Sequence, residues 1–456
     1  MGGETARHLD ASGQPRLGDA NSGPRDDRAA DEARRAIEAV WRIESARVIA
    51  ALARMVHDVG LAEDAAADAL VAALEQWPTE GVPANPGAWL TAIGKRKAID
   101  AVRRRVALDR KYAEIGNDIE SRLAPGGPEP DEVEDDLLRL MFVACHPLLS
   151  PDARAALTLR LLGGLSTEEI AHAYRVPEAT VGQRISRAKR TLAEADVGFE
   201  VPDGAERRER LASVLEVIYL VFNEGYAATR GDEWIRHDLC DEALRLGRIL
   251  AGLTPNDAEV HGLLALMEIQ ASRLRARTGP DGEPVLLLDQ DRGRWDHLQI
   301  RRGLAALERA ERLSGGAPAP YTVQAAIAAC HARARTGEDT DWERIATLYA
   351  TLARIEPSPI VELNRAVAVG MAYGPEAGLP LVDAIADDPA MRDYHLLPSV
   401  RGDLLAKLGR GDEAAAEFAR AASLTRNERE RALLLDRAAA VTGSAAFRLA
   451  VDADPM

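Results

Sequence analysis

The stretch LSTEEIAHAYRVPEATVGQRISRAKRTL, residues 165–192, predicts two helices joined by a tight turn. Ser166 followed three residues later by Glu169 is a capping-box pattern, which starts a helix. Residues 174–176 leave room only for a turn. Pro177 then suits the first turn of a second helix, because that turn needs no backbone donor. A short helix, a tight turn and a longer helix form the pattern of a helix-turn-helix.

The second of these helices has two distinct faces. Its apolar stripe, at helical spacing, consists of Val181, Ile185, Ala188 and Leu192. Its opposite face consists of Ala179, Gln183, Ser186, Arg187 and Arg190. Gln and Arg offer bidentate hydrogen bonds to base edges, and Arg and Lys neutralise phosphates. The face therefore suits readout of duplex DNA, with an ordinary solvated helix surface as the alternative.

A third helix is predicted just upstream. Ser150 is a helix-capping residue, Pro151 fits the first helical turn, and Asp152 lies near the positive end of the helix dipole. The following stretch, DARAALTLRLL, ends at Gly163-Gly164. Three short helices can enclose a small core behind a DNA-reading helix.

Composition limits the class of protein. The 456 residues suggest about three domains, and 46% hydrophobic residues with 4% aromatic ones and no alternating β-branched runs predict an all-α fold. A net charge of −16 argues against a protein that coats nucleic acid, but it permits local basic surfaces. Residues 1–30 lack apolar periodicity and are expected to be a disordered tail. No signal-peptide core or long apolar run occurs, so a soluble, cytoplasmic protein is expected.

The sequence predicts no metal, cofactor or catalytic centre. The three cysteines are odd in number and far apart, and nothing resembles a Cys-x-x-Cys pair: Cys145, Cys240 and Cys330. A buried thiol is a simpler interpretation of Cys145-His146 than a metal ligand. One acidic loop lacks the spacing of a calcium-binding loop: Asp281, Asp289, Asp291 and Asp296. Glu224 in FNEGY, residues 222–226, has no accompanying base, nucleophile or phosphate loop, so the protein is not expected to be an enzyme.

A second basic block, NPGAWLTAIGKRKAIDAVRRR, spans residues 85–105. Asn85 and Pro86 again predict a helix start, and the expected core anchors are Trp89, Leu90 and Ile93. The basic residues surround this helix instead of lining one face: Lys95, Arg96, Lys97, Arg103, Arg104 and Arg105. Such an arrangement suits a helix that follows the backbone of a single strand.

The helix predicted before that block, within residues 60–78, is amphipathic in a different way. Leu70, Leu74 and Trp77 are expected to share its buried face, with Ala67 beside them. An acidic stripe lies roughly opposite and consists of Asp64, Asp68 and Glu75. The stripe is either a solvated surface or a docking surface.

Taken in order, these segments resemble a bacterial RNA polymerase sigma factor of the compact extracytoplasmic-function type, which keeps only regions two and four. The resemblance covers about residues 36–192 and has two separate motifs. It implies that Asp64, Asp68 and Glu75 bind the clamp helices of the polymerase β′ subunit. It implies that unpaired −10 DNA is bound by Asn85, Trp89, Lys95, Arg96, Lys97, Arg103 and Arg104. It implies that −35 duplex DNA is bound by Ala179, Thr180, Gln183, Arg184, Ser186, Arg187 and Arg190.

Two features depart from the minimal form of that family. Gly182 lies inside the second helix of the helix-turn-helix, where glycine costs about 0.5–1 kcal/mol relative to alanine. The chain also continues far beyond Leu192. The acidic, Pro/Gly-rich linker at residues 113–136 resembles segments that thread near the active-site and RNA-exit paths of the polymerase.

From about residue 201 the sequence reads as helix after helix. The turn markers Pro320, Pro357, Pro389 and Arg426 are separated by 37, 32 and 37 residues, near the period of about 34 residues of tetratricopeptide repeats. Leu408-Gly409, Ala415 and Phe418 also resemble positions of that repeat. With FNEGY and the DQDR segment at 289–292, this half resembles the tetratricopeptide-like extension of one sigma-factor subgroup, which regulates or supports activity.

The resulting expectation is a tail at 1–30, region two at 31–112, a linker at 113–136, region four at 137–198 and a helical α-solenoid at 199–456. The expected partners are core RNA polymerase and promoter DNA, with intramolecular contact between the extension and regions two and four. A stand-alone helix-turn-helix regulator with a repeat-type sensor is the alternative, but it leaves the 60–105 segments unexplained. A peptide-binding scaffold leaves both basic blocks unexplained.

Overall fold

The computed structural model describes residues 24–108, 130–174, 176–227, 235–280 and 282–452, without the side chains of 24–33, 105–108, 130–134 and 443–452. All regular elements in these ranges are helices, and the one isolated β-bridge there joins Thr278 to Pro284. The all-α class expected from the sequence is confirmed. Within the same ranges, none of the helices is long and apolar enough to cross a membrane.

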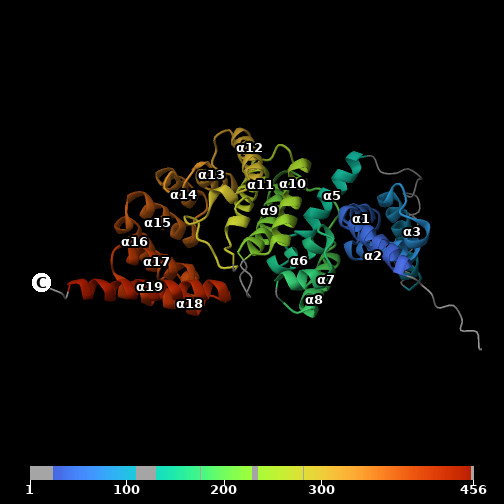
Figure 1. Ribbon diagram of the computed structural model, residues 1–456. Coiled ribbons are helices and arrows are strands. Elements are labelled where there is room, and N and C mark those ends of the chain that lie inside the picture. The colour runs from blue at the N-terminus through green and yellow to red at the C-terminus, as the bar shows by residue number, and fades with distance from the viewer. Residues whose placement is uncertain (1–23, 109–129, 175, 228–234, 281, 453–456) are drawn as a thin grey trace, which may run out of the picture.

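The N-terminal helices α1 (Pro24–Val56), α2 (Val59–Glu80) and α3 (Pro86–Leu108) pack against one another (Figure 1). Residues 24–30, expected to belong to a tail, form the first turns of α1, and residues 1–23 lie outside the described residues. The Asp58 carboxylate accepts a hydrogen bond from the Leu61 N–H at 3.0 Å, and Asn85 Oδ1 accepts one from the Ala88 N–H at 3.1 Å. The predicted helix start at Asn85 is confirmed.

Four helices follow: α5 (Pro130–Ala144), α6 (Pro151–Leu161), α7 (Thr167–Tyr174) and α8 (Glu178–Glu194). The capping box is formed in both directions. The Glu169 N–H donates to Ser166 Oγ at 3.0 Å, and the Ser166 N–H donates to the Glu169 carboxylate at 2.7 Å. Ser150 caps α6 by accepting a hydrogen bond from the Ala153 N–H. The sequence therefore defined the start of both helices correctly.

The expectation that the linker extends to residue 136 is wrong, because α5 already begins at Pro130. The Asp136 side chain is only 2% exposed, and it pairs with Arg54 of α1 at 3.1 Å and with Arg139 at 2.7 Å. An acid that reads as part of a solvated segment is in fact a buried anchor between α1 and α5. Linker residues 113–129 lie outside the described residues.

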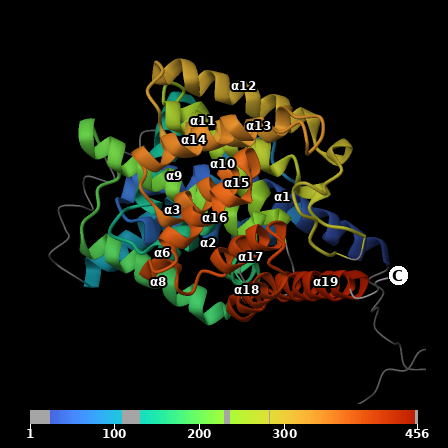
Figure 2. The same cartoon turned by 90° about the vertical axis from the view of Figure 1, so that its left-hand side faces the viewer.

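The C-terminal half is a succession of helices in which neighbours along the chain pack against each other (Figures 1 and 2). Its first helices are α9 (Gly204–Tyr226), α10 (His237–Leu253), α11 (Ala258–Ala271), η2 (Leu274–Ala276), η3 (Arg292–Arg294), α12 (His297–Ser314) and α13 (Pro320–Arg333). The remaining helices are α14 (Trp342–Ile355), α15 (Pro359–Tyr373), α16 (Pro375–Ile385), η4 (Pro389–Met391), α17 (Leu396–Lys407), α18 (Gly411–Leu424) and α19 (Glu428–Asp452).

The turn markers that suggested a repeat coincide with helix boundaries only in part. Pro320 begins α13, and Pro357 and Arg426 come just before α15 and α19, whereas Pro389 begins the extra 3-10 helix η4 ahead of α17. Phe418 is fully buried, as a repeat position should be.

The small residue near Phe418 was assigned one position too late. Ala414 is fully buried against Gly402, where a side chain would approach the Ala414 carbonyl at 3.2 Å, whereas Ala415 is half-buried.

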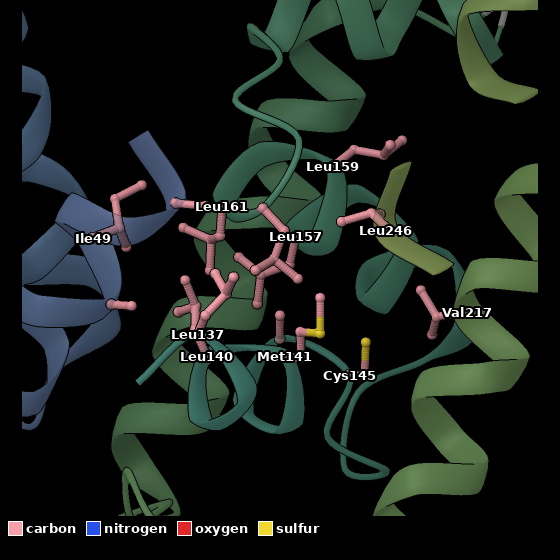
Figure 3. Packing of buried hydrophobic residues seen from close by; sticks show 14 of the residues in the cluster. Ile49, Leu137, Leu140, Met141, Cys145, Leu157, Leu159, Leu161, Val217 and Leu246 are labelled. Atoms are coloured by element: carbon pink, nitrogen blue, oxygen red, sulfur yellow. The ribbon is translucent and has the colours of Figure 1, made fainter. Parts of the chain in front are cut away.

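A single hydrophobic core runs from α1 to α11. Figure 3 shows Ile49 of α1 on one side, Leu140 of α5 and Leu157 of α6 in the middle, and Val217 of α9 with Leu246 of α10 on the other side. All five side chains are 1% exposed or less. The first helices of the C-terminal half therefore share a core with the helix-turn-helix and are not merely tethered to it.

Candidate nucleic-acid and polymerase interface

Helix α8 presents its predicted polar face to solvent. Val181, Ile185, Ala188 and Leu192 form its buried stripe, as expected. The exposed face consists of Ala179, Gln183, Ser186, Arg187 and Arg190, while Thr180 and Arg184 at its edge are half-buried. Arg184 pairs with Asp152 at the start of α6 at 2.9 Å. The exposed set combines hydrogen-bonding side chains with positive charge on one rigid helix, as base-edge recognition in a major groove requires.

Helix α3 is anchored along one narrow stripe and is basic elsewhere. Leu90 and Ala98 are buried, and Gly94 lies so close to Leu52 of α1 that a Cβ would come within 2.8 Å of it. The bases outside the stripe are Lys95, half-buried, and the exposed Arg96, Lys97, Arg103 and Arg104. The side chain of Arg105 lies outside the described residues. The predicted distribution of positive charge around this helix is confirmed for the described bases.

Trp89 and Asn85 at the start of α3 already have structural partners. The Trp89 ring is half-buried and packs edge-on against Trp77 of α2, with 5.2 Å between ring centroids. Asn85 is exposed but uses its Oδ1 atom as a helix cap. Each residue therefore retains only part of its surface for a nucleotide.

Helix α2 differs from the sequence interpretation on its buried face. Trp77 is buried as expected, but Leu74 is 41% exposed and Leu70 is half-buried. The side that packs against α1 and α3 is instead formed by the small residues Ala62, Ala65, Ala66, Ala69 and Ala73. Alanines allow the neighbouring helix backbones to approach closely, so the bulkiest face is not the buried one. The outer surface of α2 therefore combines Val71 and Leu74 with the three expected acids, Asp64, Asp68 and Glu75, which are all exposed.

An ion-pair group joins α2 directly to α8. Glu63 of α2 is only 7% exposed and pairs with Lys189 of α8, and it also pairs with Arg160 of α6 at 2.6 Å. The same Lys189 ammonium lies 3.7 Å from Asp64. Burial alone would raise the pKa of Glu63, but Lys189 and Arg160 outweigh it and hold that pKa below its ordinary value. The contact was not foreseen, because nothing in the local sequence links these positions.

The C-terminal half also contacts the helix-turn-helix through polar groups. Arg154 of α6 is buried and donates to the Ser213 hydroxyl and, at 2.9 Å, to the Glu216 carboxylate, both on α9. Arg245 of α10 donates to the Leu162 carbonyl at the end of α6, and Arg236 donates to the Ala173 carbonyl near the end of α7.

A cleft of about 1930 Å³ lies between the N-terminal helices on one side and α7 and α10 on the other. Asn85, Thr91 and Lys95 of the basic block line this cleft together with the acids Glu168, Asp241 and Glu242. Part of the surface expected to bind an unpaired strand therefore shares this cleft with α10 of the C-terminal half.

Asp291, Asp296 and Cys145, which were considered as metal ligands, have other roles in the structure. Asp291 and Asp296 cap η3 and α12 by accepting backbone hydrogen bonds, while Asp281 lies outside the described residues. Cys145 is 1% exposed, and burial raises its pKa to about 12. The Cys145 thiol contacts the Thr158 hydroxyl at 3.3 Å, which supports its interpretation as a core residue.

Two protein-family models match the N-terminal part of the chain. The model of sigma-70 region 2 matches residues 42–107, and that of sigma-70 region 4 matches residues 139–192. The ECF RNA polymerase sigma factor SigL of Mycobacterium tuberculosis is 32% identical over 143 residues, which cover 30% of this chain and 76% of SigL. The chain belongs to the ECF RNA polymerase sigma factors.

Further relatives extend this result. The probable ECF RNA polymerase sigma factor SigI of Mycobacterium tuberculosis is 25% identical to this sigma factor over 173 residues, covering 38% of the chain and 59% of SigI. An uncharacterized protein of Rhizobium meliloti is 45% identical over 394 residues, covering 85% of this chain and 92% of the relative. A family of unknown function (DUF6596) matches residues 210–311, from α9 to α12. The C-terminal half of this sigma factor is thus similar to proteins whose names give it no role.

The sequence interpretation of this sigma factor missed the residues that connect its parts. Glu63, Lys189, Arg160 and Arg236 were not singled out, although each contacts a helix distant in the sequence. The available signal was weak. Glu63 falls among the small residues that turned out to form the buried face of α2.

Proposed function

We propose that this sigma factor binds core RNA polymerase and directs transcription initiation at promoters with a −10 and a −35 element. The observation that carries the proposal is the 143-residue similarity to an ECF sigma factor, together with two cationic helices, α3 and α8, in the order of that family. A stand-alone regulator would need α8 alone.

Each exposed surface has a distinct role in this proposal. The outer face of α2, with Asp64, Asp68 and Glu75, binds the polymerase clamp helices. The start and basic surface of α3 hold the unpaired −10 strand, because basic groups follow a released strand, through Asn85, Trp89, Lys95, Arg96, Lys97, Arg103 and Arg104. The exposed face of α8 reads −35 duplex DNA through Ala179, Gln183, Ser186, Arg187 and Arg190, with the half-buried Thr180 and Arg184 at its edge.

The proposed division of the chain follows these roles. Region two spans residues 31–112, region four begins with α5 at residue 130 and ends at 198, and the tetratricopeptide-like extension spans 199–456 and regulates or supports initiation in the cytoplasm. The shared core and the contacts of Arg154 and Arg236 support a direct action of the extension on region four.

The α2–α8 contact has a consequence for promoter binding. Lys189 lies on the duplex-reading helix, and Asp64 lies on the polymerase-binding face, so one ion-pair group ties together two surfaces with different targets. We infer that this contact opens when polymerase and DNA are engaged together. The closed arrangement is then the resting form of the free protein.

The experiment is a binding test with purified core polymerase and labelled promoter DNA, singly and together. The proposal expects stable capture of the protein by core polymerase and promoter-specific DNA binding only when polymerase is present. Tight, sequence-specific duplex binding without polymerase, and no capture by polymerase, would favour the stand-alone regulator instead.

A further inference from the structure

The FNEGY motif, residues 222–226, forms the last residues of α9. The Arg236 N–H at the start of α10 donates to the Gly225 carbonyl at 2.7 Å. A Cβ at Gly225 would come within 2.7 Å of the Cys240 backbone nitrogen and 2.9 Å of the Arg236 carbonyl. Glycine is therefore required at position 225 for α10 to begin against the end of α9, and this close approach brings Arg236 to Glu224.

Arg236 and Glu224 form a buried pair that reaches into region four. The side chains are 5% and 12% exposed. One Arg236 nitrogen, Nη1, donates both to the Glu224 carboxylate and to the carbonyl oxygen of Ala173. Ala173 lies in the last turn of α7, where carbonyls lack partners inside the helix and a cation is favourable. The extension thus supplies a cationic cap to the first helix of the helix-turn-helix.

The capped position is immediately before the turn that sets the direction of α8. Tyr174 follows Ala173, and its hydroxyl is buried. Burial, with the Glu224 carboxylate nearby, raises the pKa of Tyr174. Val176 packs against the same core, and its N–H donates to the Ala171 carbonyl at 3.1 Å. Ala173, before position 175, is therefore held by Arg236, and Val176, after it, is held by the core.

We propose that Arg236 and Glu224 are positioning residues for −35 recognition: the extension fixes the angle between α7 and α8, and so sets how α8 enters the major groove. This inference rests on the proposed function of α8. A buried ion pair adds little net stability but restricts geometry, and bidentate hydrogen bonds to base edges depend strongly on angle and distance. Loss of the pair should therefore reduce discrimination between sequences. Because removing one partner also leaves the other charge buried and destabilises the fold, folding is measured separately for each variant.

The chain offers a matched control in Arg245. It also extends from α10, pairs with an acid of its own helix, Glu242, at 2.7 Å, and donates to a helix-end carbonyl of region four. Its acceptor is the Leu162 carbonyl at the end of α6, not the end of α7. Arg245→Gln therefore removes a contact to a helix-end carbonyl of region four without touching the turn, at a side chain that is 35% exposed, against 5% for Arg236.

The test uses the full chain bound to core polymerase. Duplexes bound by the wild-type holoenzyme are first selected from a pool with a randomised −35 segment. Affinity for the selected duplex is then compared with affinity for a scrambled one for the wild type, Glu224→Gln, Arg236→Gln, Arg236→Lys and Arg245→Gln. Core-polymerase affinity and thermal unfolding are measured for each variant.

We expect the selected-to-scrambled ratio to fall about tenfold or more in Glu224→Gln and Arg236→Gln, since one bidentate base contact carries discrimination of that size. Arg236→Lys should recover part of the ratio, Arg245→Gln should keep it, and core-polymerase affinity should not change. An unchanged ratio in folded Glu224→Gln, or an equal loss in Arg245→Gln, overturns the inference while leaving the proposed function intact. A wild-type protein that never binds polymerase overturns the proposed function itself.

Discussion

Lys189 on α8 and Glu63 on α2 form an ion pair that joins the helix assigned to duplex DNA to the helix assigned to the polymerase. Arg160 completes the group from α6. Because removal of one partner leaves a buried charge with less compensation, the cost of breaking such a pair is larger than its net contribution to stability. Substitution of Lys189, Glu63 or Arg160 should therefore strongly weaken the contact between regions two and four.

Lys189→Ala should loosen the contact between α2 and α8. The Glu63 carboxylate would keep Arg160 but lose its link to α8, so the mean distance between fluorophores on exposed α2 and α8 positions should increase. Thr191→Ala, an exposed change on α8, is the control. Equal energy-transfer efficiency in Lys189→Ala and wild type would show that the ion pair does not hold the two helices together.

The same contact should weaken in acid. The folded-state pKa of Glu63 is lowered, so its stabilising contribution is fully present above the unfolded value and is lost as the pH falls through the folded value. Energy transfer should be constant near pH 7 and decrease below about pH 4, since unperturbed glutamate titrates near 4.3. Glu63→Gln should already be open at pH 7 and should lack this transition. A wild-type transition that persists unchanged in Glu63→Gln would assign it to other carboxylates.

Arg187→Ala and Gln183→Ala should each weaken −35 recognition by about 1–3 kcal/mol, the usual worth of a base-edge contact. Both side chains are exposed on α8, so folding should be unaffected. The measurement is holoenzyme affinity for promoter DNA beside core-polymerase affinity. Equal loss of both affinities would mean that the recognition face has been misplaced.

The double change Asp64→Lys with Asp68→Lys should abolish capture by core polymerase. It reverses the charge of the exposed acidic face of α2, and Asp64→Lys also places a second cation beside Lys189 of α8. Glu308→Lys with Glu311→Lys makes the same charge change on exposed positions of α12 and is the control. If both double variants bind polymerase equally well in a pull-down, the acidic face is only a solvated surface.

Gly182→Ala should stabilise the protein by about 0.5–1 kcal/mol, because glycine is unfavourable within a helix. A Cβ there would meet only Thr167 Cγ2, at 3.9 Å, so there is room for a methyl group. Denaturant unfolding measures this gain. If Gly182 instead serves close approach to DNA, the variant will be more stable but bind the −35 element less well; unchanged stability would contradict the expected helix effect.

Local signals in the sequence were sufficient for the helices of the candidate site. The Ser166–Glu169 capping box, the Asn85 cap and the α8 stripe depend on residues within a few positions of one another, and all three are formed. The prediction that the large hydrophobic residues of α2 form its buried face was wrong. The helices pack so closely that alanines form this face, and Leu74 is exposed. The spacing of large hydrophobic residues therefore identifies the buried face of a helix only where those large residues are the buried ones.

Contacts between distant segments could not be predicted in the same way. Arg236 lies 63 residues from Ala173, and Lys189 lies far from Glu63 in the chain, so no spacing rule relates them. Asp136 appeared to belong to an acidic linker, because the composition of a segment does not show which of its acids will meet an arginine of another helix. These pairings arise from tertiary packing alone.

Run-off transcription tests the central claim most directly. Purified core polymerase is supplied with the full-length protein and two templates, one fully duplex and one with an unpaired bubble over the −10 element. The account predicts start-site-specific transcripts from the duplex only when the protein is present, and reduced dependence on the α8 face when the bubble is supplied. The account would be contradicted if the polymerase produced no start-site-specific transcript from either template when the protein is present.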